Sequence, residues 1–409
     1  MAKDYKDVVV GLDIGTAKVM VVVAEVMPSG ELKLAGLGVA PSNGLKRGVV
    51  VNIDATVQSI QQALKEAELM ADCKITSVYT GITGAHIRGI NSSGMVAVKD
   101  REVTPADVAR VVETARAINI STDQRLLLVE PQEFVIDGQD VKEPIGMSGI
   151  RLEAKVHIVT GAQSAAENII KCVRRCGLEV DALLLNPLAS SAAVLSEDER
   201  ELGVALVDIG AGTTDVAIFT GGAIRHTAVI PIAGDLITSD IAMALRTPTK
   251  DAEDIKVESG YAKQLLADPE QQVEVPGLGD RGPRMLSKQA LAGVIEPRVE
   301  EIFSLVQQVV RESGFEEVLS SGIVITGGSA VMPGMVELGE DIFLKPVRRG
   351  VPRYTGSLSD MVAQARAATV MGLLEEARTA RMRGQKVAQQ SGSMKTAFGR
   401  IKDFIVGNF

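Results

Sequence analysis

The chain has 409 residues, of which 46% are hydrophobic and 40 are glycine, and this composition is typical of a globular α/β protein with about two to four folded units. Its three cysteines cannot form a disulfide framework and no apolar leader opens the sequence, so we expect a reducing, cytosolic environment. No apolar run approaches the roughly 20 residues that span a bilayer, which leaves only peripheral membrane contact. The net charge is −9, yet from Ala377 onward seven basic residues oppose a single acid, Asp403.

Two similar hairpins stand about half the chain apart. The stretches VVVGLDIGTAKVMVVVA (8–24) and GVALVDIGAGTTDVAIFT (203–220) share an apolar strand, Asp-Ile-Gly, a turn of small residues and a second apolar strand. This internal repeat predicts two related halves.

Helix and strand signals follow the first hairpin. Helical spacing predicts a helix over 54–72 with Asp54 as its N-cap, and a second helix begins at VTPADV, with Thr104 as the cap and Pro105 at the first position. The segment RLEAKVHIV alternates like a half-exposed strand, with one face made of Leu152, Ala154, Val156 and Ile158. Residues 85–161 are therefore predicted to form a small α+β insert.

The thiols and imidazoles suggest no chemistry. Cys172 and Cys176 lie one helical turn apart, but they lack a nearby His or further Cys, and we expect core or helix-surface thiols rather than a metal site.

In the second half, a helix-rich stretch (227–303) separates the second hairpin from a third glycine-rich turn, GIVITGGSAVMPG. A polar segment, RMRGQKVAQQSGS, then lacks the apolar residues needed for packing and is predicted to be a flexible linker.

Both hairpins have the residues of a phosphate and metal site. A strand that ends in Asp places a carboxylate where it can face hydrated Mg²⁺, and glycines let backbone N–H groups approach phosphate oxygens. The first turn offers Asp13, Gly15, Thr16 and Lys18, and the second offers Asp208, Gly210, Gly212, Thr213 and Thr214. Either turn alone also fits an ordinary hairpin, whereas the two together predict a nucleotide clamped at a cleft between two domains, with Asp13 and Asp208 holding Mg²⁺ through water.

The third turn is predicted to hold adenine. The predicted strand 323–326 is followed directly by Gly327, Gly328 and Ser329, and a flat base can lie on exposed glycine backbone. Glu253 and Lys256 sit three apart on one helical face and can reach a ribose or adenine edge; a solvated ion pair is the alternative interpretation.

The C-terminal segment is amphipathic on a helical wheel. Met394, Ala397, Phe398, Ile401, Phe404, Ile405 and Phe409 gather on one side, with Lys395, Arg400 and Lys402 toward its edges. This pattern predicts a helix that lies on an anionic membrane surface, and docking on the protein's own core is the alternative.

The order of the three turns resembles the actin, Hsp70 and sugar-kinase superfamily over residues 8 to about 375. NPLASSAAVL and AATVMGLL look like its two connecting helices, and AGDLITSDIAMAL looks like the helix after the second phosphate turn. Within the superfamily the chain is most similar to the FtsA family of bacterial division proteins, through LASSAAVLSEDERELGVALVDIGAGTTDVAIFTGGAIRHT, DAEDIKVESGYA, the insert and the amphipathic end.

The resemblance implies an actin-like fold of two ribonuclease-H-like halves. The first half would comprise 1–84 and 162–195 around the insert 85–161, and the second half 196–226 and 304–378 around a subdomain 227–303, followed by a linker 379–393 and a membrane helix 394–409.

The resemblance also implies function. A member of this family binds ATP with Mg²⁺, associates with itself and tethers the tubulin-like FtsZ filament to the cytoplasmic face of the inner membrane at the septum, where later division proteins follow. No nucleic-acid partner is expected. The subdomain 227–303 would receive FtsZ, with Arg284, Arg298 and Glu301 as candidate contacts. Asn186 stands where relatives often place a Glu that orients water, so hydrolysis would be slow at most, with Asn186 positioning the water.

Three other classes share parts of this pattern. A small-molecule kinase needs a carboxylate base beside a substrate pocket, and an Hsp70-like chaperone needs a peptide-binding domain after its ATPase, where only about 30 residues follow here. A pilus-assembly adaptor resembles FtsA without the lipid-seeking end.

Overall fold

The computed structural model describes residues 7–279 and 281–384. The amphipathic segment 394–409 and the linker from residue 385 onward lie outside these described residues. Within them, no helix combines the length and apolar character needed to cross a membrane.

The first half is built on a five-stranded sheet in the order β11-β6-β1-β2-β3. β1, β2 and β3 are antiparallel, whereas β6 and β11 continue the sheet in parallel with β1. The strands are β1 (Val8–Ile14), β2 (Lys18–Val26), β3 (Leu32–Pro41), β6 (Ser77–Ile82) and β11 (Glu179–Leu185). Nearly every residue of β1 and β2 is buried, as expected of valine-rich strands that are covered on both faces.

The second half repeats this topology. Its sheet has the order β14-β13-β12-β17-β18, again with three antiparallel strands followed by two parallel ones. The strands are β12 (Val204–Ile209), β13 (Thr214–Thr220), β14 (Ala223–Ile230), β17 (Ile323–Thr326) and β18 (Val347–Arg349). The two related halves that the hairpins predict are therefore confirmed.

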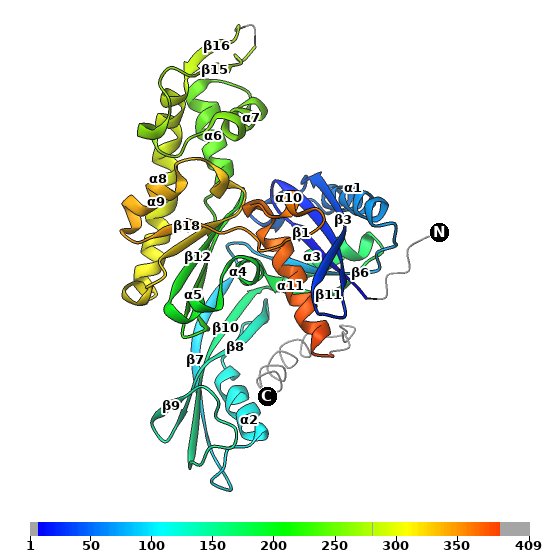
Figure 1. Cartoon of the computed structure of the whole chain (residues 1–409), viewed down its shortest axis with the longest axis vertical. Helices are drawn as coiled ribbons and strands as arrows, with labels where there is room; N and C mark the ends of the chain where they lie inside the picture. Colours follow the sequence, from blue (N-terminus) through cyan, green and yellow to red (C-terminus); the bar gives the residue numbers. More distant parts are fainter. Residues whose placement is uncertain (1–6, 280, 385–409) are drawn as a thin grey trace.

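Helices cover both sheets (Figure 1). On the first sheet lie α1 (Ile53–Ala71) and α3 (Gln163–Arg175), and on the second lie α6 (Gly234–Leu245), α8 (Lys288–Glu312) and α9 (Met335–Phe343). With α6 and α8, the helix α7 (Thr249–Ser259) and the hairpin β15 (Gln272–Val275) and β16 (Arg284–Ser287) form the subdomain at the upper end of the molecule. Shorter elements are β4 (Leu45–Lys46), β5 (Val49–Val50), α5 (Glu197–Leu202), α10 (Ser359–Val362) and 3₁₀ turns at Gln264–Leu266, Glu316–Val318, Ser329–Val331 and Ala365–Ala367.

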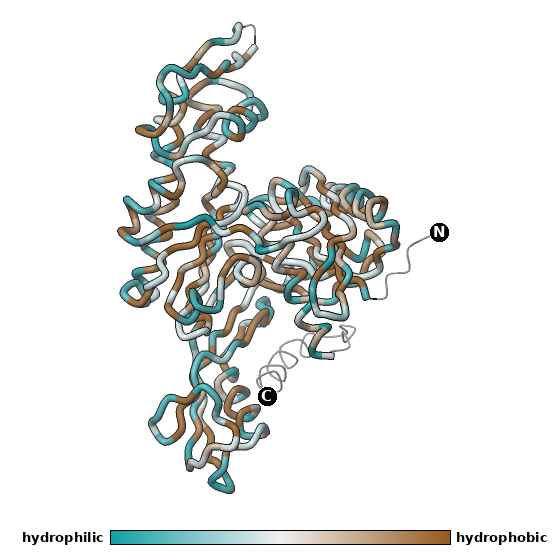
Figure 2. Tube along the Cα trace, viewed as in Figure 1, coloured by the Kyte–Doolittle hydropathy of each residue, from teal (hydrophilic) through white to brown (hydrophobic). Residues whose placement is uncertain are grey.

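The two halves meet on a pair of crossing helices. α4 (Asn186–Val194) and α11 (Ala368–Met382) share one buried cluster with residues of both sheets. The crossing is so close that a Cβ atom added to Gly372 would lie 1.6 Å from the carbonyl oxygen of Ala189. Figure 2 shows the apolar segments, in brown, concentrated along the sheet strands and around this junction. The small residues of the two predicted connecting helices therefore let the two backbones come together.

The insert projects from the lower end of the molecule (Figure 1). Its sheet has the order β7-β10-β8-β9, formed by β7 (Arg88–Ala97), β8 (Gln124–Ile136), β9 (Gln139–Val141) and β10 (Arg151–Ala162) and packed by α2 (Pro105–Arg116). The predicted inward face of β10 is confirmed, because Leu152, Ala154, Val156 and Ile158 are fully buried. The predicted cap is confirmed too, since Thr104 and Asp107 form a reciprocal capping box.

Two local predictions are wrong. The N-cap of α1 is Asn52, whose side chain accepts the N–H of Ala55 at 3.1 Å, while Asp54 lies in the first turn and pairs with Arg175. Asparagine and aspartate are about equally favourable as N-cap residues, so residue type alone could not decide between Asn52 and Asp54. The position where the backbone enters the helix decided it. The second wrong prediction concerns the linker 379–393. Helix α11 continues to Met382, so residues 379–382 of the predicted linker belong to a helix.

Cys172 and Cys176 are free thiols in and just after α3. Burial raises the pKa of both, that of Cys176 to about 11, which disfavours the thiolate that a metal site requires. Among residues 7–279 and 281–384, no three or more His, Cys, Asp or Glu side chains lie close enough together to ligate one metal ion directly.

We predict that Gly372→Ala destabilises the protein. Overpacking costs about 1 to 3 kcal/mol, while alanine recovers about 1 kcal/mol of helix propensity, and the obstacle here is a backbone carbonyl that cannot rotate away. Urea denaturation should show a net loss of unfolding free energy. The matched control is Gly339→Ala in α9, where the added Cβ would make ordinary contacts at 3.4 Å; equal effects of both changes would contradict the close crossing.

Candidate functional site

The two predicted turns face each other across the junction of the halves. Each closes with the same backbone hydrogen bond, from Gly15 N–H to the Lys18 carbonyl and from Gly210 N–H to the Thr213 carbonyl, both at 2.9 Å. A Cβ atom on Gly212 would lie 2.5 Å from Thr16 Oγ1, so only glycine fits where the turns approach. The structure therefore brings the two predicted phosphate turns together.

Asp13 and Asp208 are the penultimate residues of the central strands of the two sheets and are buried. The pKa of Asp13 is raised to about 6, chiefly by burial; the charge of Lys18 acts to lower this pKa and the charge of Asp208 acts to raise it. Burial also raises the pKa of Asp208. Two buried carboxylates that repel each other are suited to a hard divalent cation, whose charge would remove the repulsion.

A third carboxylate, Asp215, belongs to this group and was missed by the sequence analysis. It lies directly opposite Asp208 in the β12–β13 ladder, whereas Met20 takes the corresponding position opposite Asp13. Burial, together with the charge of Asp208, raises the pKa of Asp215 to about 7. The signal was present in DIGAGTTD, where an aspartate stands at each end of the turn.

Hydroxyl groups hold these carboxylates from several elements. Thr83, just after β6, donates to Oδ1 of Asp215, and Thr213 donates to Oδ2 at 3.3 Å. Ser190 of α4 donates to Oδ2 of Asp208, which Thr369 of α11 approaches at 3.3 Å. Both connecting helices thus contact one carboxylate of the site, a link between site and hinge that no local sequence pattern reveals.

Lys18 supplies positive charge beside the carboxylates. Its ammonium donates to the carbonyl of Arg366, just before α11, and burial lowers its pKa.

The third predicted turn closes the site from the second half, because Ser329 Oγ donates to the Gly210 carbonyl at 2.8 Å. A Cβ atom on Gly327 would lie 2.4 Å from Asp208 Oδ1, whereas one on Gly328 would meet nothing within 4 Å. The backbone at Gly328 therefore faces open space, as a surface for a flat ring requires.

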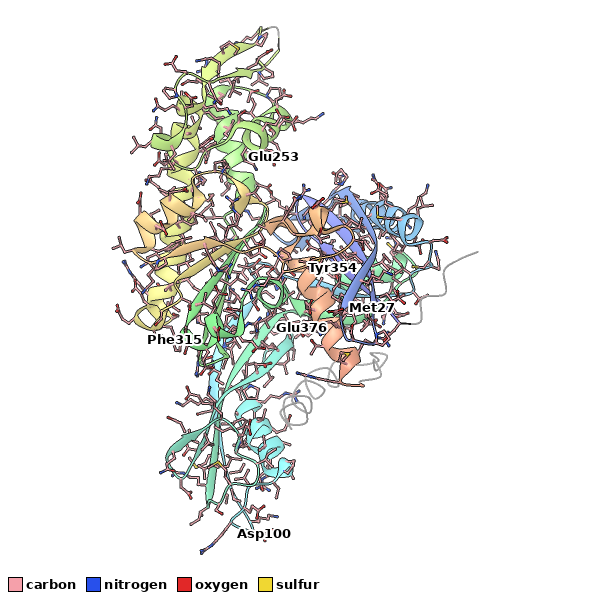
Figure 3. The ribbon with its side chains drawn as sticks, in the orientation of Figure 1. Met27, Asp100, Glu253, Phe315, Tyr354 and Glu376 are labelled. Atoms are coloured by element: carbon pink, nitrogen blue, oxygen red, sulfur yellow. The ribbon has the colours of Figure 1, made fainter. Side chains whose placement is uncertain are left out.

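Glu253 and Lys256 form the ion pair of the alternative interpretation, with their charged atoms 2.6 Å apart, but Lys256 is not solvated. Its ammonium is buried and also donates to Thr238 Oγ1 at 2.8 Å and to the Gly234 carbonyl at 3.2 Å. Glu253 is half exposed and lies at the base of the upper subdomain, where that subdomain joins the second half (Figure 3). A Cβ atom added to Gly234 would lie 2.4 Å from Ser329 Oγ of the third turn, so this pair borders the site.

Asn186 opens α4 at the end of β11, against Gly81 of the neighbouring strand. Its Oδ1 is buried and has no hydrogen-bond partner among the described residues. An unpaired buried acceptor costs free energy unless a water or ligand satisfies it, which is compatible with a role in holding water.

The candidate FtsZ contacts lie in or beside the upper subdomain but make internal bonds. Arg298 of α8 forms a two-pronged ion pair with Asp240 at 2.6 and 3.0 Å and also contacts Glu301. Arg284 of β16 donates to the Leu245 carbonyl.

Comparison with known proteins decides the family. The sequence model described as "Cell division protein FtsA" matches residues 205–372, and the one described as "SHS2 domain inserted in FTSA" matches residues 84–160. The cell division protein FtsA of Pseudomonas aeruginosa is 54% identical over 98% of both chains, and that of Neisseria meningitidis is 50% identical over 97% of this chain and 98% of its own. The chain belongs to the FtsA family of cell division proteins.

Solved structures similar to this FtsA family member share its fold. The PilM-PilN type IV pilus biogenesis complex matches with a TM-score of 0.63 and 18% identity, over 92% of this chain and 98% of the other. MreB5 of Spiroplasma citri bound to AMPPNP matches with a TM-score of 0.58 and 15% identity, over 93% and 99% of the two chains. The actin-like fold is thereby confirmed, and the SHS2 match falls within a residue of the insert boundaries that the sequence suggested.

We predict that the unfolding free energy of the metal-free protein falls as the pH rises from about 5 to about 8, because of Asp215. Its folded-state pKa of about 7 lies above the unfolded value of 3.8, so the native state binds more protons in this window and is stabilised at its acidic end. The effect of this one group is at most roughly 3 kcal/mol. Urea denaturation of wild type and Asp215→Asn should show a shallower pH slope in the variant. Parallel slopes would contradict the shared burial of the carboxylates.

Proposed function

We propose that this FtsA family member binds ATP with Mg²⁺ between its halves, associates with itself and tethers FtsZ filaments to the cytoplasmic face of the inner membrane at the division septum. The observation that carries the nucleotide part is the pair of matched turns with three buried carboxylates between them. Related folds support it, since MreB5 was solved with ADP and with AMPPNP. MamK was solved as a double helical filament, which supports self-association.

The residues divide the work by chemistry. Asp13 and Asp208 would hold Mg²⁺ through its water ligands, with Asp215 adding a third acceptor, and the bound cation would supply charge neutralisation at the phosphates. Backbone N–H groups of Gly15, Gly210 and Gly212, the hydroxyls of Thr16, Thr213 and Thr214, and the ammonium of Lys18 would bind phosphate oxygens. Adenine would rest on Gly327 to Ser329, with Glu253 and Lys256 at the ribose or adenine edge.

Hydrolysis is at most slow in this proposal. Asn186 can position water through its unpaired Oδ1 but cannot accept the proton, because an amide is not a base at neutral pH. Nucleotide then acts mainly as a conformational switch, and the hydroxyl links from Asp208 to both connecting helices give that switch a route to the hinge.

The terminal segment 394–409 supplies the membrane contact. Met394, Phe398, Ile401, Phe404, Ile405 and Phe409 would enter the interface while Arg400 and Lys402 meet anionic headgroups, each basic residue contributing about 1 kcal/mol. One copy binds reversibly and a filament of copies binds firmly, because linked sites act together.

FtsZ would bind the upper subdomain near Arg284, Arg298 and Glu301. Arg298 is partly buried by its two-pronged contact with Asp240, whereas Arg284 and Glu301 are exposed and therefore the more accessible contacts. Later division proteins would be recruited through the insert.

We predict that Asp13→Asn and Asp208→Asn each weaken Mg²⁺-dependent ATP binding at least tenfold, because each removes one carboxylate from the cation's water shell. Isothermal titration calorimetry with and without Mg²⁺ measures this. Asp100→Asn at the far tip of the insert is the control and should bind as wild type does (Figure 3). Undiminished binding by the double variant Asp13→Asn/Asp208→Asn would contradict the site.

We predict that FtsZ polymers sediment with anionic vesicles only when the full-length chain is present. A chain stopped after Gln390 should not sediment FtsZ with the vesicles, because it lacks the amphipathic segment. The same shortened chain should still sediment with FtsZ polymers when no vesicles are present. Neutral vesicles serve as the control, since they remove the electrostatic contribution. Equal vesicle pelleting of the full and shortened chains would remove the anchor from the proposal.

A further inference from the structure

The insert belongs to the first half by connection but contacts the second half along one strand. It leaves the first half after Thr83 and Gly84 and returns at α3. Its strands β7, β8 and β10 nevertheless lie against β14, the edge strand of the second sheet. We define the contact between these three strands and Ile224–Thr227 of β14 as the latch.

Side chains of the insert donate hydrogen bonds to backbone carbonyl groups at the edge of β14. β14 is the edge strand of its sheet, and side-chain amides of the insert bond to its carbonyl oxygens at Ile224 and Arg225. Gln132 donates to the Ile224 carbonyl at 2.8 Å, and Asn91 donates to the Arg225 carbonyl at 3.1 Å. These bonds fix the strand edge to the insert as backbone pairing would.

A hydrogen-bond chain continues from the exposed Asn91 to the buried His157 and Thr227. The Asn91 amide donates to Arg225, so its Oδ1 faces His157 Nδ1 at 2.6 Å and accepts that N–H. His157 Nε2 is then an acceptor and takes the hydroxyl of Thr227 at 2.9 Å. Burial lowers the pKa of His157 to about 4, so the imidazole is neutral at neutral pH and can donate at Nδ1 while it accepts at Nε2, as this chain requires.

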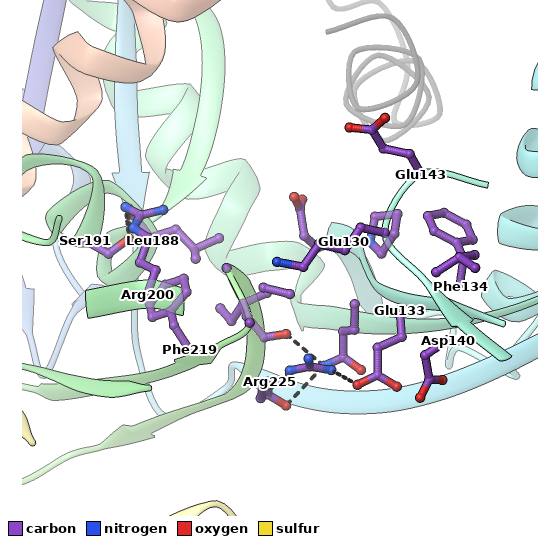
Figure 4. Close-up of a pocket in the computed structure, with 18 of the residues that line it drawn as sticks. Glu130, Glu133, Phe134, Asp140, Glu143, Leu188, Ser191, Arg200, Phe219 and Arg225 are labelled. Carbon is purple, nitrogen blue, oxygen red and sulfur yellow. Dashed lines mark hydrogen bonds and ion pairs between the residues drawn. The ribbon is translucent and has the colours of Figure 1, made fainter. Parts of the chain in front are cut away.

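An ion pair closes the latch at its other side. Arg225 approaches Glu133 of β8 at 2.5 Å, with only 12% of the arginine side chain exposed, and Glu133 also binds Lys155 at 2.9 Å. Figure 4 shows Arg225 facing Glu133 between the β13–β14 turn and the insert. Since a partly buried pair is costly to break by removing one partner, the insert and β14 are expected to move together.

The space beside the latch leaves the insert room to move relative to α4 of the first half. A cavity of about 770 Å³ separates β8 and β9 from α4, α5 and the end of α11, and Arg225 and Glu133 lie in its wall. At the neck, Gly84 has a φ of +135°, a conformation open chiefly to glycine. The base of the insert packs where both halves meet, since Ile87, Leu128 and Val229 contact one cluster. This base can serve as a pivot.

The latch strand is also connected to the candidate nucleotide site. β14 pairs with β13 along its length, and β13 begins at Thr214 and Asp215. Asp215 is bonded to Thr83 at the neck of the insert. A shift of the second sheet relative to the first therefore acts on the insert at both its neck and its side.

We propose that the insert is mechanically a part of the second half, so that closure of the halves around nucleotide swings the insert relative to the first half. This inference rests on the proposed nucleotide function. It assigns the insert the role of a lever that reports the state of the site to whatever binds its far end.

Distances between spin labels test the proposal in the full-length chain after Cys73→Ser, Cys172→Ala and Cys176→Ala. Labels are placed pairwise at exposed positions: Asp100 at the tip of the insert, Leu344 on the second half and Leu69 on the first half. On addition of ATP and Mg²⁺, the 69–344 and 69–100 distances should change together while the 100–344 distance stays constant. A constant 69–100 distance with a changing 100–344 distance would show that the insert follows the first half and would overturn the proposal.

Latch variants provide the second arm. Arg225→Gln and Thr227→Val should broaden the 100–344 distance distribution even without nucleotide, because each removes a partner from the latch. Arg151→Gln is the matched control, since its ion pair with Glu153 lies within the insert. Circular dichroism checks folding, and Arg225→Gln alone decides if Thr227→Val fails to fold. A distribution as narrow as wild type in the latch variants would overturn the proposal.

The two arms separate this inference from the proposed function. If calorimetry detects no ATP binding, the proposed function fails, while the nucleotide-free comparison of wild type with Arg225→Gln still decides the latch. If ATP binds and the 69–344 distance does not change, the swing is overturned although the nucleotide site stands.

Discussion

The structure depends on three aspartate side chains that the fold buries together near the ends of β1, β12 and β13. Asp13, Asp208 and Asp215 lie at one junction, and burial raises the pKa of each. Burying carboxylates is unfavourable unless protons, hydrogen bonds or a cation compensate. The hydroxyls of Thr83, Ser190, Thr213 and Thr369 provide part of that compensation, and each comes from a different place in the chain. The energetic state of this cluster is therefore tied to the positions of both sheets and both connecting helices.

This arrangement explains why nucleotide and conformation should be linked. A divalent cation would replace protons at the carboxylates and favour the arrangement of the halves that holds it best, which is a population shift in the ordinary sense. The crossing of α4 and α11 at Gly372 leaves little room for sliding, so relative motion of the halves is expected to be a rotation about that contact. The insert, held along β14, turns the same rotation into movement at the far end of the molecule.

The sequence predicted what is local and missed what is made by distant contacts. The two hairpins, the Thr104 cap and the inward face of β10 follow from period-two alternation and turn chemistry within a few residues. Asp215 was visible in its motif, but its partnership with Thr83 required knowing that β6 and β13 converge. The roles of Ser190 and Thr369 could not be derived, because a hydroxyl on a small-residue helix gives no sign of which carboxylate it will meet. Lys256 was placed correctly on its helix, yet its burial against Thr238 and Gly234 depended on tertiary packing.

The most direct test of the central claim is a crystal structure with Mg²⁺ and a non-hydrolysable ATP analogue. The account predicts one cation in the junction, with its water ligands bonded to Asp13 and Asp208 and with the phosphates on the two glycine turns. A nucleotide bound elsewhere, or a triphosphate at the turns with no cation near either carboxylate, would contradict it.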